Sequence, residues 1–140
     1  PQMRVKTIRE GIVFTLGGPS TFDPLSDEVK PAVRRMLVER LVPLLKGRNN
    51  KVKVIGHAAR KRTDGSPWKD LDDLSYARAK AVVKVLVEAG LDDRVFQLAG
   101  VGTREPVKVN AMAPAEAAEN RRVDIILTEV LVDELDRSAQ

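Results

Sequence analysis

The stretch from Lys51 to Ala79 reads KVKVIGHAARKRTDGSPWKDLDDLSYARA, and the rest of the fold can be argued outward from it. Its first residues alternate between charged and apolar as far as Val54, the pattern of a strand with one face in solvent. The strand turns at Gly56-His57, a polar loop follows, and a helix is predicted at Leu74-Ser75. Such a strand, loop and helix form a common ligand-binding arrangement, because a rigid scaffold holds the loop in place.

The N-terminal side of this stretch predicts one strand and one helix. Residues 11–16, GIVFTL, have the β-branched and aromatic content of a buried strand, which we take as the first strand. Apolar residues at helical spacing over 29–45 predict a helix. Ser26 or Asp27 is its expected N-cap, and Pro43 is expected to bend or end its last turn.

The C-terminal side supplies the other elements. The apolar pattern after Leu74 predicts a helix that ends at Gly90, with Asp72 or Asp73 as N-cap. A strand, a short helical turn and a last strand follow at 95–98, 115–119 and 123–130.

This order of elements predicts an α/β (α+β) two-layer sandwich. Its pattern is βαβαββ, with a mixed sheet and helices on one face. We predict a single domain over residues 1–140, with a core at about 11–128 and a charged tail at 133–140.

Composition limits the function classes. The 140 residues are 43% hydrophobic, enough for a core, and the absence of cysteine excludes disulfides and thiolate chemistry. A net charge of +4 favours anionic partners. Interspersed acidic residues and an aromatic content of 4% argue against nucleic acid. The sequence has no apolar run long enough to span a bilayer, so any membrane anchor is expected outside it.

Catalytic chemistry has little to build on. His57 is the single histidine, and a structural role at the strand end is favoured over a triad or zinc site. The loop carboxylates, which do not have EF-hand spacing, predict a solvated loop: Asp64, Asp70, Asp72 and Asp73. Trp68 is either a lid that packs on the domain or an exposed contact. We predict no enzyme activity, no cofactor and no metal.

Four motifs in order resemble those of the OmpA-like C-terminal domain family. They are Ile55-Gly56-His57, Leu74-Ser75-Tyr76-Ala77-Arg78-Ala79, Gly100-Val101-Gly102 with Glu105-Pro106, and Asn120-Arg121-Arg122-Val123. The match covers roughly Gly11 to Thr128. From residue types alone, Asn120-Arg121-Arg122 would be an ordinary ion-paired strand entrance, with its adjacent arginines pointing to opposite sides.

The resemblance implies a periplasmic domain that binds the peptide stem of peptidoglycan without catalysis. In the family, an aspartate two residues after the histidine and the arginine of the helix motif hold the charged groups of diaminopimelate. Arg78 matches that arginine. The candidate ligand-binding residues are His57, Ala59, Asp64, Asp70, Leu74, Arg78, Asn120, Arg121 and Arg122.

Ala59 departs from the family pattern, since it stands where the family has the aspartate. Loss of one charge-assisted hydrogen bond costs on the order of 1.5–3 kcal/mol, which weakens binding about tenfold or more. Asp64 or Asp70 could supply the missing acid. The alternative is a domain that has kept the fold, lost the wall ligand and serves as a protein interaction or dimerisation module.

The length of the loop after His57 and the lead-in strand from Arg9 to Leu16 resemble MotB-type members. This likeness implies a periplasmic domain tethered to the inner or outer membrane by a segment outside this sequence. It also implies a possible homodimer and a possible flagellar-stator role.

Overall fold

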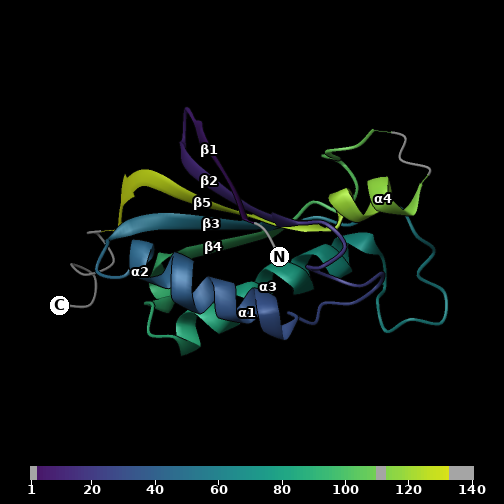
Figure 1. Ribbon diagram of the computed structural model, residues 1–140, viewed down its shortest axis with the longest axis horizontal. Coiled ribbons are helices and arrows are strands. Elements are labelled where there is room, and N and C mark those ends of the chain that lie inside the picture. Colours follow the sequence, from purple (N-terminus) through teal and green to yellow (C-terminus); the bar gives the residue numbers. More distant parts are fainter. Residues whose placement is uncertain (1–2, 110–112, 133–140) are drawn as a thin grey trace.

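A five-stranded mixed sheet with helices on one face forms the protein (Figure 1). The computed structural model describes residues 3–109 and 113–132. The strands are β1 (Met3–Ile8), β2 (Gly11–Gly17), β3 (Asn50–Gly56), β4 (Phe96–Gly100) and β5 (Arg122–Leu131). The helical segments are α1 (Pro31–Met36), η1 (Leu37–Leu41), α2 (Val42–Leu45), α3 (Leu71–Glu88), η2 (Asp93–Val95) and α4 (Pro114–Asn120).

The strand order β1-β2-β5-β3-β4 makes the sheet mixed. β5 lies between β2 and β3 and is antiparallel to both, whereas β3 and β4 are parallel. From β2 onward, the main elements follow the predicted βαβαββ order, so the predicted fold class is confirmed. The short helical turn expected at 115–119 is α4, which lies beyond one end of the sheet (Figure 1).

The N-terminal strand is where the sequence prediction was wrong. The strand at 11–16 is the second of the sheet, because β1 precedes it and pairs with it as an antiparallel hairpin. β1 is an edge strand whose residues are all exposed or half-buried. Residues Met3 to Lys6 do alternate between apolar and basic, but this pattern covers only four residues, and Val5 is exposed.

The helix starts also differ from prediction. The first helix begins at Pro31 after Lys30, without a side-chain cap, so neither Ser26 nor Asp27 is its N-cap. α3 begins at Leu71, and its N-cap is Asp70, whose carboxylate accepts a hydrogen bond from the backbone N–H of Asp73. Several acidic residues in a row could each have capped this helix, which is why the sequence left the position open.

Pro43 lies in the last turn of the first helix, as expected, because α2 ends at Leu45. The five residues of η1 form a π-helical turn, and the chain returns to α-helix in α2 with Pro43 near its start. Because proline lacks an N–H and crowds the carbonyl four residues earlier, a wider turn just before it relieves the clash.

The core lies between the sheet and the two long helical segments below it in Figure 1. Alternate residues of the inner three strands face the helices: Phe14, Leu16, Val52, Val54, Val123 and Ile125. They meet the buried faces of the helices at Val33, Leu37, Leu41, Val82 and Leu86. Burying each such side chain contributes roughly 1.5–3 kcal/mol, so this interface accounts for most of the stability.

Two strand-end glycines let the first turns of α3 sit directly on the sheet. A Cβ on Gly56 would lie 1.7 Å from the carbonyl oxygen of Ser75, and one on Gly100 would lie 2.4 Å from the backbone nitrogen of Tyr76. Both contacts are with backbone, which cannot move aside as a flexible side chain would. The close approach fixes where the middle of α3, and hence Arg78, meets the ends of β3 and β4.

We expect Gly56→Ala to lower the free energy of unfolding by about 3 kcal/mol or more, because the new methyl group must push α3 off the sheet. Chemical denaturation monitored by circular dichroism measures this. Gly65→Ala is the control: it has open space around it but a φ of +77°, so only backbone strain of about 1–2 kcal/mol is expected. Equal losses in the two variants would contradict the close packing.

Candidate functional site

The guanidinium of Arg78 is buried at the centre of the candidate site. Arg78 lies on the inner face of α3 and is 0% exposed. Its Nε donates to the carbonyl of Ser26 at 2.8 Å, its Nη1 to that of His57 at 3.1 Å, and its Nη2 to that of Asp23 at 3.1 Å. One side chain thus ties the end of β3 to the loop that precedes α1.

Phe22 and Arg121 complete the surroundings of this cation. The guanidinium carbon of Arg78 lies 5.0 Å from the centre of the Phe22 ring, a cation–π contact in a buried setting. Arg121 donates from Nε to the carbonyl of Phe22 at 2.9 Å. The 22–26 segment is therefore held by two arginines, one from α3 and one from the C-cap of α4, just before β5.

A cavity of about 240 Å³ lies beside this cluster. Its walls come from the segment before α1, the loop after β3, the buried face of α3, and α4. The lining residues are Pro24, Leu25, Ala59, Arg60, Lys61, Leu74, Arg78, Pro114, Ala117 and Arg121. Arg78 forms its inner wall, since that residue has almost no solvent-accessible surface, whereas Arg121 is only half-buried.

Four of the predicted site residues therefore line one cavity: Ala59, Leu74, Arg78 and Arg121. Arg60 and Lys61 also line the cavity; the loop from Arg60 to Asp73 was expected at the rim of the site, but neither residue was among the candidate ligand-binding residues. The walls formed by Pro24, Leu25, Pro114 and Ala117 were not predicted. Those residues are far from the loop in the sequence, and no local pattern marks them.

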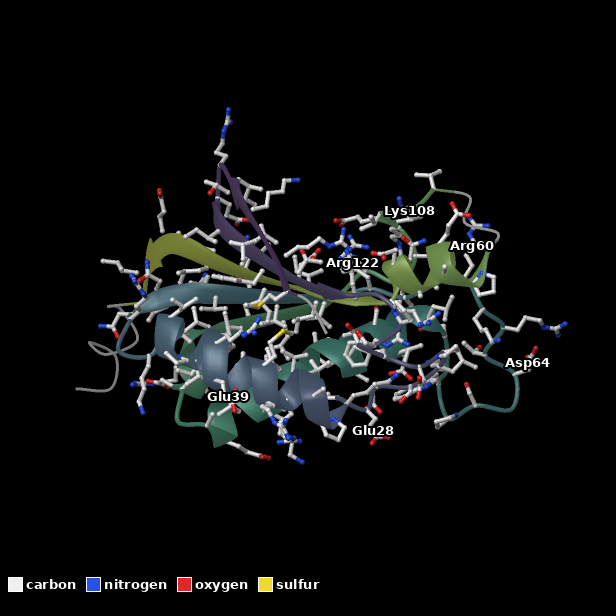
Figure 2. The ribbon with its side chains drawn as sticks, in the orientation of Figure 1. Glu28, Glu39, Arg60, Asp64, Lys108 and Arg122 are labelled. Atoms are coloured by element: carbon white, nitrogen blue, oxygen red, sulfur yellow. The ribbon has the colours of Figure 1, made fainter. Side chains whose placement is uncertain are left out.

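Asp64 and Asp70 are not among the residues that line the cavity. Figure 2 shows Asp64 at the outer end of the loop, whereas Arg60 lies beside α4. The Asp64 side chain is 73% exposed and pairs with Arg62 at 2.7 Å. The Asp70 carboxylate caps α3. Both carboxylates are therefore engaged outside the cavity, and neither supplies the cavity with an acid.

Trp68 packs on the domain, which was one of its two predicted roles. Its indole Nε1 donates to the carbonyl of Leu25 at 2.7 Å, and its side chain is half-buried. Together with the Arg78 contact to Ser26, this bond fixes the segment that forms one wall of the cavity.

Asn120 and Arg122 support neighbouring segments and do not line the cavity. The Asn120 amide pairs with both the N–H and the carbonyl of Lys108, at 2.8 and 2.9 Å. Arg122 donates to the carbonyl of Glu105 at 2.8 Å. The two adjacent arginines do point to opposite sides, as expected for extended backbone, with Arg121 on the cavity side.

The remaining motif residues hold α3 against the turn after β4. The Ser75 hydroxyl accepts a hydrogen bond from the N–H of Gly102 and donates to the carbonyl of Asp72, both at 2.9 Å. Asp72 also pairs with Arg104 through both of its oxygens, at 2.6 and 2.8 Å. These contacts give the Leu-Ser and Gly-Val-Gly motifs structural roles beside the cavity.

His57 turns its ring to the sheet face opposite the helices. Its Nε2 lies 2.9 Å from Oδ2 of Asp124, although the alignment is poor for a hydrogen bond. Asp124 also accepts a hydrogen bond from the Thr15 hydroxyl at 2.9 Å and lies 3.5 Å from Nε of Arg122. The ring is therefore in a polar cluster separate from the cavity, in agreement with the structural role predicted for this residue.

The electrostatics of the cavity wall reflect two neighbouring cations. Burial and the positive charge of Arg121 together lower the pKa of Arg78 to about 10, against a smaller opposing effect of Asp27. Burial also lowers the pKa of Arg121, against the opposing influence of Asp23. Both guanidiniums remain charged at neutral pH, in a place where positive charge is costly.

Comparison with known proteins identifies the family. Residues 21–121 match the sequence profile of the OmpA family. The chain belongs to the OmpA family. The resemblance of the four motifs is therefore confirmed by a match that spans the cavity walls from the segment before α1 to the start of β5.

Individual OmpA-family relatives agree with this assignment. The outer-membrane lipoprotein YfiB of Pseudomonas aeruginosa is 32% identical over 118 residues, which is 84% of this chain and 67% of YfiB. The cell wall anchor of the T6SS from Pseudomonas aeruginosa has a TM-score of 0.76 and 29% identity over 91% of this chain and 88% of that one. The periplasmic domain of Helicobacter pylori MotB has a TM-score of 0.81 over 99% of this chain and 89% of that one; at 20% identity it shows the fold alone.

Neither a membrane helix nor a metal centre is found in the part of this OmpA-family chain that the structure describes. No helix within residues 3–109 and 113–132 is both long and apolar enough to cross a bilayer. The same residues contain no group of three or more histidine, cysteine or acidic side chains that could hold a metal ion.

Arg78→Lys should lower the free energy of unfolding by about 2–4 kcal/mol, because a single ammonium cannot replace a planar fork that reaches three carbonyls. Arg34→Lys is the matched control, because Arg34 is half exposed and its ion pair with Glu88 is long at 3.7 Å. We expect this variant to change the free energy of unfolding by no more than about 0.5 kcal/mol. Urea denaturation of both variants is the measurement. A similar small loss in both would show that the buried fork is dispensable.

Acid sensitivity should depend on Asp124. Burial raises the pKa of this carboxyl, but the contacts with His57, Arg122 and Thr15 outweigh burial and hold the pKa below its usual value. A lowered folded-state pKa means that the stabilisation is complete above the unfolded value of about 4 and is lost as the pH falls through the folded value. We expect Asp124→Asn to flatten the loss of stability below about pH 4 in denaturation curves measured from pH 7 to pH 2. An unchanged acid slope would contradict this role.

Proposed function

We propose that this chain is a non-catalytic peptidoglycan-binding domain, which anchors a membrane-tethered protein to the cell wall in the periplasm. The binding site would be the cavity lined by Arg78, Arg121, Leu74 and Ala59. The observation that carries the proposal is this convergence. Motif residues far apart in the sequence, on α3 and at the start of β5, line one cavity together with the loop after β3.

The size of the cavity supports a small, charged part of a larger ligand. Sites for whole drug-sized molecules have volumes of about 300–1,000 Å³, so about 240 Å³ suits one amino-acid side chain of a peptide stem. A glycan strand would then remain outside. Most of the ligand's contacts would form along the rim of the cavity, where Arg60 and Lys61 are both exposed.

The cations have different roles in this proposal. Arg78 already donates to three carbonyls, so it would hold the cavity walls and supply positive potential at the inner end. Arg121 uses one N–H on Phe22 and is half-buried, which leaves the outer part of its fork to meet a carboxylate. In this proposal Arg121, and not Arg78, makes the direct contact with the carboxylate of the ligand.

The named relatives support an anchoring role. One is called a cell wall anchor, another is an outer-membrane lipoprotein, and a third is a periplasmic domain of MotB. By analogy, the tether would be a membrane or lipid anchor outside this chain. A flagellar-stator-like role is the more specific form of the proposal; it rests on the loop length and lead-in strand that resemble MotB-type members.

Catalysis is not part of the proposal. The ring of His57, the single histidine, faces Asp124 and not the cavity. The carboxylates of the loop pair with arginine or cap a helix. Residues 3–109 and 113–132 therefore place no acid–base pair beside the proposed ligand.

An alternative proposal is an interaction or dimerisation module that has lost the wall ligand. Ala59 favours it, because this residue lines the cavity with a methyl group that accepts no hydrogen bond. The two proposals differ in whether the cavity is needed for wall binding.

Ala117→Phe should block the cavity and reduce retention on purified peptidoglycan sacculi about tenfold or more, measured by co-sedimentation over a range of sacculus concentrations. Ala117 is a half-buried cavity residue on α4. The control is Ala115→Phe, the same substitution at an exposed position of the same helix, for which retention should not change. Arg121→Glu gives a second variant with the same expected loss.

Circular dichroism of each variant checks that the fold is kept. Equal retention of wild type, Ala117→Phe and Arg121→Glu would overturn the cavity as the site. No retention of the wild type would overturn wall binding and favour the interaction module.

A further inference from the structure

The charge of the cavity is one-sided. Among the described residues that line it, four are cationic and none is acidic. The cations are Arg60, Lys61, Arg78 and Arg121. An ammonium group placed among them would meet like charges, whereas a carboxylate would meet donors from several directions.

The nearest acidic residues do not correct this balance. Asp23 pairs with Lys30 at 2.9 Å, and its side chain is 69% exposed. Asp27 lines a different groove, on the α1 side of the same segment. Their charges act on Arg121 and Arg78 from a distance, but neither side chain reaches the cavity wall.

The wall position that could hold an acid is apolar. Ala59 is 9% exposed and contributes only a methyl group, next to Arg60 and Lys61. Asp64 and Asp70, the closest loop acids in the sequence, are paired with Arg62 and with the start of α3. An ammonium would therefore lose its hydration in the cavity without gaining a carboxylate partner.

We propose that this cavity selects the carboxylate end of a ligand that carries no ammonium group beside it. A dicarboxylate, or an amino acid whose amine is acylated, has this chemistry. The inference rests on the proposed function for the identity of the natural ligand. Within peptidoglycan, it assigns the cavity to stems whose side-chain amine is acylated, in preference to stems with a free amine.

The positive charge of the walls is the physical reason. Arg78 and Arg121 are two neighbouring cations in a partly desolvated place, and their mutual repulsion is relieved when an anion binds between them and the rim. A zwitterionic end brings a carboxylate and an ammonium together. The attraction of the carboxylate to the arginines is then cancelled by the repulsion between the ammonium and the same arginines.

Two probes with the same carbon chain test the inference. Pimelate and meso-diaminopimelate share seven carbons and two carboxylates and differ only in the two ammonium groups. Calorimetric titration of the wild-type chain should show pimelate binding about tenfold more tightly or better, with weaker binding at higher salt. Tighter or equal binding of diaminopimelate, or no binding of either acid, would overturn the inference.

Variants separate the cavity from the general positive charge of the chain. Ala117→Phe should abolish pimelate binding and Ala115→Phe should preserve it; the same preference in both would mean a nonspecific charge effect and would also overturn the inference. Ala59→Asp restores an acid to the wall and should shift the preference toward diaminopimelate by about tenfold or more. No shift would contradict the role given to Ala59.

The sacculus co-sedimentation and the calorimetric titration can give opposite results, so the proposed function and the selectivity are tested separately. Retention on sacculi with a preference for diaminopimelate leaves the proposed function in place and removes the inference. Pimelate binding in the cavity without retention on sacculi supports the selectivity and removes the proposed wall ligand.

Discussion

The buried guanidinium of Arg78 is the interaction on which the site depends. A charge at this depth is stable only if its donors are satisfied, and three backbone carbonyls from two separate segments satisfy it. The segment before α1 has little regular structure of its own, so it is held in place by this side chain, by Arg121 and by Trp68. One polar group therefore organises the loops around it, much as apolar burial organises the sheet and helices.

The position of that guanidinium follows from the glycines at the ends of β3 and β4. Gly56 and Gly100 let α3 approach to backbone contact, and this brings the inner face of the helix to the place where two parallel strands end. A cavity then forms where the loop after β3, the segment before α1 and α4 meet. Its charge comes from Arg78 on α3 and from Arg60, Lys61 and Arg121 outside that helix. The last three lie outside the long helices and the core strands, where residues can vary without changing the scaffold.

Much of the fold could be predicted from local patterns. The buried strands and the two long helices have strong periodicity, because each places one face against the core. β1 was not predicted, because its alternation covers only Met3 to Lys6 and no residue of this edge strand is fully buried. The start of α3 was misplaced by three residues because neighbouring aspartates are equivalent as caps until the backbone selects one. The π-helical turn before Pro43 was not foreseen because helix packing on both sides of the proline decides whether the helix stops or widens.

The sequence by itself determined the family, the order of the motifs and the presence of an alanine at position 59, since these are properties of residue identity and spacing. Only the tertiary structure decided which of those residues share a cavity. It brought Ala59, Leu74, Arg78 and Arg121 together with Arg60 and Lys61, and it placed Asn120, Arg122 and the loop aspartates outside the lining. The physical reason is that the net charge of a cavity is a sum over segments distant in the chain. Whether a given carboxylate lies beside the cavity depends on how the chain packs and on which group that carboxylate pairs with.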